Sequence, residues 1–366
     1  MDNNEKYMQM ALDLAVRGTG YVNPNPLVGA VIVKNGEIIG SGWHRRYGDL
    51  HAERNAFASC KESCEGADMY VTLEPCCHFG KTPPCTEAVI ANKIKRVFIG
   101  SDDPNPKVAG KGVALLKAHG IEVITGVLKE ECDKINDIFF HYITTGTPYV
   151  IYKYAMTADG KTATVSGKSQ WISCESSREH VQYTRKRMAA IMTGIGTVIA
   201  DDPMLTCRLE DPGVHTRIIC DSSLRISPES RIMQTADKYP VIIATVSDDE
   251  EKRRLLEEKG AVIVKTQPSD GRVDLKELMT VLAGKYKIDS VLLEGGSELA
   301  YSAMKAGIVN KVQAYIAPKM FGGRGAGTPL GGAGVDSPDD AFMLGTPQIL
   351  VSGDDLLLEY TIGANN

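Results

Sequence analysis

Four residues in the first quarter of the chain have the types and spacing needed to hold a zinc ion and to move protons beside it. They are His51, Glu53, Cys76 and Cys85, and Cys76 follows a proline. A catalytic zinc site uses three imidazole or thiolate ligands and leaves a fourth position for water. Zinc lowers the pKa of that water toward neutrality, so hydroxide is available at physiological pH. Glu53 could then carry protons from the water to a ring nitrogen and to departing ammonia.

The choice of thiolates is the open part of this pattern. Nucleobase deaminases combine His-x-Glu with Pro-Cys-x-x-Cys, whereas here the stretch HFGKTPP separates Cys77 from Cys85. Adjacent cysteines are poorly placed to bind one ion together. We therefore expect Cys76 and Cys85 to be the ligands, with Cys77 as the alternative to Cys76. A purely structural zinc would take four protein ligands, and the sequence offers no evident fourth.

The overall composition is ordinary for a soluble globular protein. The chain has 366 residues, which favours two domains. Its formal net charge of −5 argues against a general binder of nucleic acid or of anionic membranes. The N-terminal residues lack a secretory pattern, and the nine cysteines are irregularly spaced, which favours reduced thiols over a disulfide framework. We expect a cytoplasmic enzyme with a phosphorylated small-molecule substrate, and neither a nucleic-acid nor a membrane partner.

Helices and strands alternate along the first part of the chain. Helical periodicity covers residues 5–17, and two β-rich runs flank Asn35-Gly36, which is a strong hairpin signal. We expect further helices at 51–60, 86–92, 113–118 and 130–142, and strands at 68–73, 96–100 and 121–124. A turn-rich break at 144–148 marks a boundary between domains 1–146 and 147–366. The first domain is expected to be a layered α/β domain.

The second part continues the alternation and predicts a second α/β domain. Strands are expected at 149–155, 189–192, 216–221, 240–245, 261–265, 290–294 and 312–317, and helices at 176–186, 249–259, 275–283 and 298–306. Glycine turns after two strands, at 194–196 and 295–296, could bring the backbone close to a phosphate group. The third glycine of G-x-G-x-x-G is missing, which disfavours a standard Rossmann domain. The glycine-rich stretch 321–334 is expected to be either a mobile loop over a site or a flexible surface connection, and we favour the second.

The segments PNPLVGAVIVKNGEIIGSGWH, HAE and VTLEPCCHFGKTPPC resemble the deaminase domain of the bifunctional deaminase/reductase family of riboflavin biosynthesis. The inserted HFGKTPP loop is itself that family's pattern. The resemblance implies a cytidine-deaminase-like three-layer α/β/α domain with Zn²⁺ on His51, Cys76 and Cys85, and with Glu53 as the catalytic residue. It also places three residues at the substrate, namely Asn25, His44 and Lys81. The chain departs from the family pattern at Cys77 and at Arg54-Asn55.

The segments KYAMTADGKTA, GKSQWIS, GIGTVIADDPMLTCR and LLEGGSELA resemble the reductase half of the same family. The resemblance implies a dihydrofolate-reductase-like α/β domain that binds NADPH at the strand ends. Its implied cofactor contacts are Ala155, Trp171, Thr197, Asp201, Ser223 (with Ser222 as the alternative), Gly296, Ser297, Glu298, Leu299, Ala300, Tyr301 and Ser302. Its implied substrate contacts are Ser169, Arg185, Leu205, Arg208 and Glu294.

These features together predict a bifunctional enzyme, and the resemblance implies that it forms homo-oligomers. Zinc-hydroxide deamination would remove the ring 2-amino group of 2,5-diamino-6-ribosylamino-4(3H)-pyrimidinone 5′-phosphate, and NADPH would then reduce the ribosyl chain to ribityl. One alternative is a nucleoside- or RNA-editing deaminase with an appended binding module, but the aromatic content of 6% and the negative charge count against it. A second alternative is a zinc-stabilised scaffold without catalytic activity.

Overall fold

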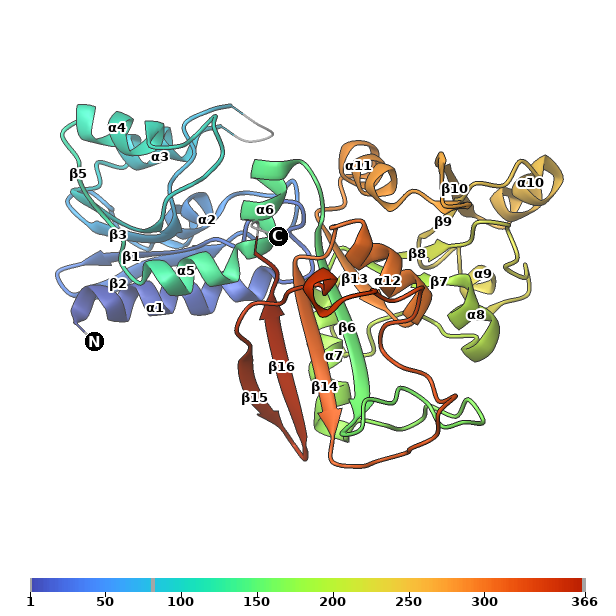
Figure 1. Cartoon of the computed structure of the whole chain (residues 1–366). Helices are drawn as coiled ribbons and strands as arrows, with labels where there is room; N and C mark the ends of the chain where they lie inside the picture. Colours follow the sequence, from blue (N-terminus) through green and yellow to red (C-terminus); the bar gives the residue numbers. More distant parts are fainter. Residues whose placement is uncertain (1, 80–82, 364–366) are drawn as a thin grey trace. The chain divides into compact units, whose positions relative to one another are not determined.

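The structure, a computed structural model, describes residues 2–79 and 83–363. Its contacts divide the chain into two compact units, Met1–Gly146 and Thr147–Asn366 (Figure 1). Each unit is a sheet with helices on both faces. No helix in the described parts of the chain is both long enough and apolar enough to cross a bilayer.

The first unit contains a five-stranded sheet in the order β2-β1-β3-β4-β5. Its strands are β1 (Gly29–Lys34), β2 (Glu37–Trp43), β3 (Asp68–Leu73), β4 (Arg96–Ser101) and β5 (Glu122–Thr125). Strand β1 is antiparallel to both of its neighbours, whereas β3, β4 and β5 are parallel. The expected hairpin is confirmed, because Lys34 pairs with Glu37 across Asn35-Gly36.

Helices cover both faces of this sheet because side chains alternate along the strands. Helices α1 (Asn3–Ala15) and α5 (Lys129–Ile135) pack on the face that carries Val31 and Val33. Helices α2 (Ala52–Ser59), α3 (Cys85–Ala91), α4 (Lys111–Ala118) and α6 (Asp137–Thr145) cover the face of Ala30 and Ile32. This is the expected three-layer arrangement, and Figure 1 shows α1 and α5 across the sheet from α2, α3 and α4.

Two glycines let α2 approach the sheet closely. A Cβ atom on Gly40 would lie 2.7 Å from the Ala56 carbonyl oxygen, and one on Gly42 would lie 2.4 Å from the Ala56 nitrogen. Both positions are on β2, directly under α2. Any larger side chain there would push the helix away from the sheet.

The single helix expected at 130–142 is wrong, because Asn136 separates α5 from α6. The Asn136 side chain accepts from the Leu27 backbone nitrogen at 2.8 Å and donates to the Leu27 carbonyl at 2.9 Å. The backbone of Asn136 leaves the helical region, with φ −115° and ψ 16°. The buried Asn136 side chain thus forms the hydrogen bonds that another backbone segment would form with the loop at Leu27. Helical periodicity gives no sign of such a role.

The second unit contains a nine-stranded sheet in the order β10-β9-β8-β7-β13-β6-β14-β16-β15. Its strands are β6 (Tyr149–Thr157), β7 (Ala190–Gly194), β8 (Thr216–Cys220), β9 (Val241–Thr245), β10 (Ala261–Lys265), β13 (Ser290–Glu294), β14 (Lys311–Ala317), β15 (Gln348–Ser352) and β16 (Asp355–Thr361). The first seven in spatial order are parallel, and β16 and β15 add an antiparallel edge. The sequence analysis places no strand after residue 317, so this edge was missed.

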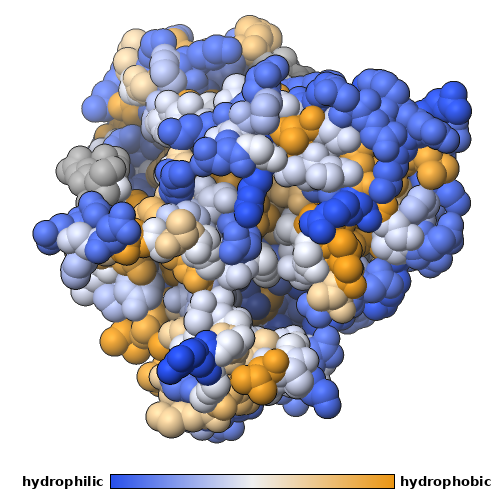
Figure 2. Space-filling model, turned by 45° about the vertical axis from the view of Figure 1, so that its right-hand side comes forward, coloured by the Kyte–Doolittle hydropathy of each residue, from blue (hydrophilic) through white to orange (hydrophobic). Residues whose placement is uncertain are grey.

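Helices flank this sheet on both faces. Helices α11 (Leu275–Tyr286) and α12 (Ser297–Lys305) pack on one face. The other face is covered by α7 (Glu175–Arg187), α8 (Ile195–Asp201), α9 (Arg231–Gln234) and α10 (Glu250–Glu258). The sequence analysis also missed the short α9 and the small ribbon of β11 (Pro268–Ser269) and β12 (Arg272–Val273). On the side seen in Figure 2, apolar residues lie in separate groups within a mainly hydrophilic surface.

Candidate active sites

His51, Cys76 and Cys85 lie close enough together to hold one metal ion. Their ligand atoms all lie within 4.8 Å of one another. The His51 Nδ1 atom is 3.5 Å from the Cys76 Sγ and 3.4 Å from the Cys85 Sγ. His51 is the N-cap of α2, Cys85 is the first residue of α3, and Cys76 follows the carboxyl end of β3. Three separate elements therefore bring one imidazole and two thiols to one point, a donor set that suits zinc.

The thiol of Cys76 has the character of a metal ligand. Hydrogen bonds from Cys85 and His51 lower its pKa to about 4. The Cys85 backbone nitrogen also donates to the Cys76 Sγ at 3.4 Å, at the start of α3. A thiolate, and not a thiol, binds a metal ion.

Cys77 lies apart from this group. Its Sγ is 3.8 Å from the Lys107 carbonyl oxygen, and it does not belong to the metal-binding group found among the described residues. The geometry thus favours Cys76 over its neighbour.

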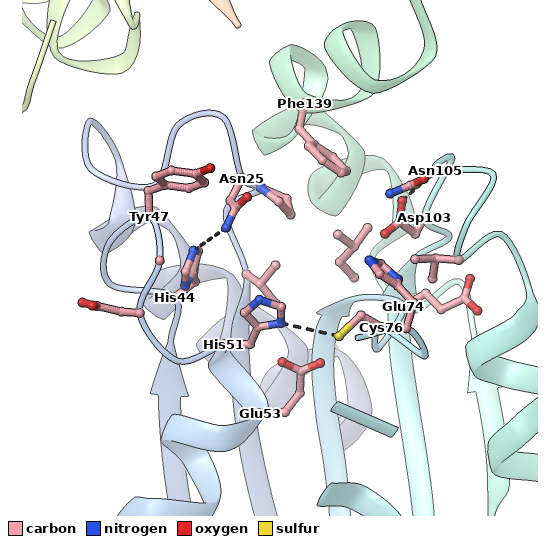
Figure 3. Close-up of a pocket in the computed structure, with 17 residues that line it drawn as sticks. Asn25, His44, Tyr47, His51, Glu53, Glu74, Cys76, Asp103, Asn105 and Phe139 are labelled. Atoms are coloured by element: carbon pink, nitrogen blue, oxygen red, sulfur yellow. Dashed lines mark hydrogen bonds between the residues drawn. The ribbon is translucent and has the colours of Figure 1, made fainter. Parts of the chain in front are cut away.

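A cavity of about 250 Å³ opens beside the metal-ligand group (Figure 3). Glu53, in the first turn of α2, is 3% exposed and lines this cavity together with His51. Burial raises the pKa of the Glu53 carboxyl. Figure 3 shows Glu53 directly below the His51 ring, so its carboxyl is placed to exchange protons with a group bound there.

Asn25 and His44 form one wall of the same cavity. The Asn25 Nδ2 atom lies 3.1 Å from the His44 Nε2, and the His44 Nδ1 lies 3.1 Å from the Leu50 carbonyl oxygen. Burial lowers the pKa of His44, which favours a neutral ring whose Nδ1 donates to Leu50 and whose Nε2 accepts from Asn25. Both residues thus line the cavity, and their contact with substrate stays a prediction. Lys81 lies outside the described residues.

The opposite wall contains polar residues that the sequence analysis missed. Asp103 and Asn105 line the cavity from the loop after β4, and the Asn105 nitrogen donates to the Asp103 carboxylate at 2.8 Å. Burial raises the pKa of Asp103 to about 6. A signal was available, because polar side chains directly after a buried parallel strand stand at the sheet edge where ligands bind.

The two residues that depart from the family pattern hold loops around the cavity. Arg54 donates to the carbonyl oxygens of Pro83 and Pro84, at 3.2 and 2.9 Å. Asn55 donates to the carbonyl oxygens of Trp43 and Leu50, at 2.8 and 3.1 Å. Arg54 therefore fixes the chain just before Cys85, and Asn55 fixes the loop that carries His44.

The second unit has a larger cavity, of about 680 Å³, at the carboxyl ends of β6, β7 and β13. This is the sheet edge where parallel α/β domains bind ligands. The predicted residues that line it are Ala155, Ser169, Trp171, Arg185, Thr197, Asp201, Leu205, Arg208, Glu294, Gly296 and Ser297. Sequence positions that lie far apart are therefore brought to one cavity, as expected.

Six other predicted contacts do not line this cavity. They are Ser223, Glu298, Leu299, Ala300, Tyr301 and Ser302. Ser223 is exposed, whereas the alternative Ser222 accepts from the Val273 nitrogen at 3.3 Å. Ala300 is fully buried in the core, and the Tyr301 hydroxyl donates to the Gly334 carbonyl. A cofactor contact from these residues stays a prediction.

A buried ion pair joins two of the predicted substrate residues. The Arg185 Nε and Nη2 atoms donate to the two Glu294 carboxylate oxygens at 2.7 and 2.8 Å. Burial alone would raise the pKa of Glu294, but the charge and hydrogen bonds of Arg185 hold it at about 2. Arg185 also donates to the Thr206 carbonyl oxygen at 2.8 Å, so its guanidinium is fixed in the wall of the cavity.

The backbone at the start of α12 has the shape needed to approach a phosphate group. Gly295 and Gly296 have φ of +72° and +76°, in the left-handed region that favours glycine. A Cβ atom on Gly295 would lie 3.1 Å from the Thr197 Oγ1. The first turn of α12 follows at Ser297, and a helix N-terminus attracts anions. These features fit a phosphate-bearing cofactor such as NADPH.

Two features of this cavity differ from the sequence analysis. Lys153 of β6 lines the cavity beside Glu294, and burial lowers the pKa of its ammonium group; the sequence analysis did not select it. The glycine-rich stretch 321–334 is not a plain surface connection, because Gly327, Thr328 and Pro329 form part of the cavity wall. The Gly327 carbonyl accepts from the Thr162 nitrogen at 2.8 Å, which ties two loops together over the site.

Comparison with known proteins assigns a family to each half of the chain. A family described as the RibD C-terminal domain matches residues 148–357. A family described as the cytidine and deoxycytidylate deaminase zinc-binding region matches residues 1–101.

Full-length relatives carry both halves in the same order. The riboflavin biosynthesis protein RibD of Actinobacillus pleuropneumoniae is 53% identical over 97% of this chain and 94% of its own length. The RibD of Bacillus amyloliquefaciens is 43% identical over 97% of this chain and 95% of its own length.

Two solved structures share the complete fold. Acinetobacter baumannii RibD has a TM-score of 0.88 at 35% identity, and each chain is covered to 99%. A Thermotoga maritima protein titled a diaminohydroxyphosphoribosylaminopyrimidine deaminase/5-amino-6-(5-phosphoribosylamino)uracil reductase has a TM-score of 0.83 at 36% identity, again with 99% of each chain covered.

We expect Cys76→Ser to lose bound zinc and Cys77→Ser to retain it. The neighbouring cysteine is a matched control, because the same atom is exchanged one residue away from the ligand group. Zinc content per chain, measured by mass spectrometry of the purified variants, provides the readout. Full zinc in Cys76→Ser together with loss in Cys77→Ser would reverse the assignment.

We expect Glu294→Gln to lower the free energy of unfolding of the second unit by about 3 kcal/mol or more at pH 7. The pKa of Glu294 falls from its ordinary 4.5 to about 2 on folding. The stabilisation is therefore complete above pH 4.5 and is lost as the pH falls toward 2. The difference between wild type and variant in urea unfolding should be constant from pH 7 to pH 5 and should shrink below that.

Glu298→Gln is the control for this substitution. Its carboxylate forms an exposed ion pair with Arg272, at 3.1 Å. Exposed pairs contribute up to about 1 kcal/mol. If both substitutions lower the free energy of unfolding equally, the buried pair contributes no more to stability than the exposed pair, which contradicts the prediction.

Proposed function

The chain belongs to the RibD family of riboflavin biosynthesis, and from this we propose how its two cavities perform that family's two reactions. The chain is a bifunctional enzyme, a zinc-dependent deaminase joined to an NADPH-dependent reductase. It deaminates 2,5-diamino-6-ribosylamino-4(3H)-pyrimidinone 5′-phosphate and then reduces the ribosyl chain of the product to ribityl. The functional boundary between the halves is proposed to lie at residues 146–147.

In the first cavity, we propose that His51, Cys76 and Cys85 hold the zinc ion. Zinc, when bound, makes a water molecule nucleophilic at neutral pH. Deamination replaces the ring amino group by oxygen and releases ammonia, so protons must move from the water to the ring nitrogen and to the leaving amine. Glu53 is the proposed carrier of these protons, and its place beside His51 in one cavity is the observation that supports the assignment most directly.

The remaining polar groups of this cavity are proposed to hold the substrate. Asn25 and His44 would contact the edge of the pyrimidine, and Lys81 would contact the phosphate. Asp103 and Asn105 face them across the cavity (Figure 3), and an acid with a pKa near 6 can accept a hydrogen bond from an amine at neutral pH.

In the second cavity, opening the ribosyl ring to ribityl adds hydride to C1′ and a proton to the ring oxygen. NADPH, when bound, supplies the hydride. We propose that the cofactor lies along the glycine turn at 295–296 with Thr197 and Trp171, and that the substrate lies by Arg185, Arg208 and Glu294. Lys153 is the proposed source of the proton, because its ammonium lies in this cavity beside Glu294 and burial lowers its pKa.

We also propose that the enzyme forms homo-oligomers through the edge strand β15. Ile349, Leu350 and Val351 are 64%, 37% and 77% exposed on this strand. An exposed apolar edge strand is a template for pairing with another chain, and a second copy paired along β15 would satisfy the free backbone groups and cover these side chains. Apart from a second copy of the chain, the proposed partners are small molecules, because a net charge of −5 does not favour binding of nucleic acid or of anionic membranes.

We expect Glu53→Gln to abolish ammonia release while zinc content and reduction of the deaminated substrate are retained. The substitution keeps the size of the side chain but removes the proton carrier, so the rate should fall at least about a hundredfold. Ammonia release and NADPH absorbance are measured in parallel on the same preparation. If Glu53→Gln releases ammonia at the wild-type rate, Glu53 is not the proton carrier. If the zinc-loaded wild type turns over neither substrate, the proposed bifunctional activity is excluded.

We expect the pair of changes Ile349→Lys and Val351→Lys to dissociate the oligomer, as measured by analytical ultracentrifugation over a range of concentrations. Val262→Lys is the matched control, because it places the same charge on β10, at the other edge of the same sheet, where Val262 is 42% exposed. An unchanged assembly in the β15 variant would contradict this interface.

A further inference from the structure

A row of polar side chains crosses four strands beneath α7, behind the reductase cavity. Glu294 of β13 is in register with Lys153 of β6, Lys153 is in register with Gln313 of β14, and Gln313 is in register with Glu359 of β16. Residues in register on neighbouring strands point to the same face of the sheet. The two inner members, Lys153 and Glu294, line the cavity, whereas Gln313 lies behind them.

Lys153 has little negative charge available to it. Its neighbour Glu294 is already bound by the Nε and Nη2 atoms of Arg185, at 2.7 and 2.8 Å. Burial lowers the pKa of the Lys153 ammonium, and the like charge of Arg185 lowers it further. A buried ammonium in this position needs additional stabilisation from neutral groups.

Tyr315 of β14 is placed to give that stabilisation. Its ring centroid lies 5.8 Å from the Lys153 Nζ, within the range in which a cation is attracted to an aromatic face. The Tyr315 side chain is fully buried, among Val181, Leu357 and Ala155. It does not line the cavity, so it can act on the substrate only through Lys153.

His180 of α7 fixes the orientation of this ring. Its Nδ1 atom lies 2.6 Å from the Tyr315 hydroxyl. Burial raises the pKa of Tyr315, so the phenol stays protonated and its O–H can donate to the His180 Nδ1. A phenol that donates a hydrogen bond has a more electron-rich ring, which strengthens its attraction for a cation.

Gln313 adds an acceptor on the same side. Its Nε2 donates to the Glu359 carboxylate at 2.6 Å, while its Oε1 is buried and has no hydrogen-bond partner among the described residues. Because the nitrogen is committed to the β16 side, the free oxygen is the atom left for the β6 side, where Lys153 lies in register.

From this arrangement we propose that Tyr315, held by His180, is a positioning residue that keeps Lys153 protonated and aimed into the reductase cavity. The inference rests on the role proposed above for Lys153. The charged or titratable groups that face Lys153 are Glu294 from β13, Arg185 from α7 and Tyr315 from β14, and Arg208 acts on Glu294 from the loop that follows α8.

The test compares Tyr315→Leu, Tyr315→Phe and His180→Gln with Tyr360→Leu. Tyr360 is a half-buried tyrosine of β16 that packs on the opposite face of the same sheet. Reductase kcat, the KM for NADPH and the pH profile of kcat are measured on the deaminated substrate. Ammonia release from the first unit of the same preparation reports that each variant is intact there.

Tyr315→Leu should lower reductase kcat about tenfold, with KM for NADPH changed by less than about twofold. Losing the ring makes the ammonium less stable, so the alkaline limb of the kcat profile should move to lower pH. Tyr315→Phe keeps the ring and should retain most of kcat. Because Tyr315→Phe and His180→Gln both lose the hydrogen bond that orients the ring, both should move the alkaline limb to lower pH, by less than Tyr315→Leu does.

An unshifted pH profile in Tyr315→Leu, or a kcat equal to that of Tyr360→Leu, would overturn the inference. If Tyr315→Leu does not fold, the shift of the alkaline limb in His180→Gln decides, because His180 is only half-buried; an unshifted limb there also overturns it. If Lys153→Met keeps the reductase kcat and its pH profile, Lys153 is not the proton source. This outcome is independent of the results for the Tyr315 variants.

Discussion

A buried charge is destabilising by several kcal/mol unless an opposite charge or a hydrogen-bonding group lies beside it. Both cavities are organised around this constraint. In the reductase cavity Glu294 keeps its charge because Arg185 donates hydrogen bonds to both carboxylate oxygens. Because Glu294 is already paired with Arg185, Lys153 depends on its other neighbours for stabilisation. In the deaminase cavity the ligand group is held by the start of two helices and the end of a strand, where backbone N–H groups are available to anionic sulfur.

The chemistry of the first cavity was predictable because its residues are close in sequence and unusual in type. His51, Glu53, Cys76 and Cys85 were selected from spacing and ligand preference, and the structure brings the three proposed ligands together. Spacing could not separate Cys76 from Cys77. The separation is geometric, since the chain turns after β3 so that one thiol meets His51 and the other meets the Lys107 carbonyl.

Other parts of the molecule depend on contacts that no local pattern records. Asp103 and Lys153 are ordinary residues in sequence, and they become notable only where a sheet edge places them in a cavity. The stretch 321–334 was expected to be a surface connection because glycines are typical of such segments, yet here they allow the backbone to approach Thr162. Strand β15 was missed because its side chains are largely exposed and lack the alternation of a half-buried strand. In β16 the first buried position is an aspartate, Asp355, which interrupts the apolar alternation.

Helix α2 carries both His51 and Glu53, and its distance from the sheet is set by two positions without side chains, Gly40 and Gly42. Neither glycine faces the cavity, and neither can take part in any chemical step. A larger side chain at either position would nevertheless move α2, and with it both the proposed ligand His51 and the proposed proton carrier Glu53. A survey that scored natural variants only by their distance from the proposed metal ligands would class such alleles as harmless, although they would leave a cell able to reduce the ribosyl chain and unable to deaminate the ring.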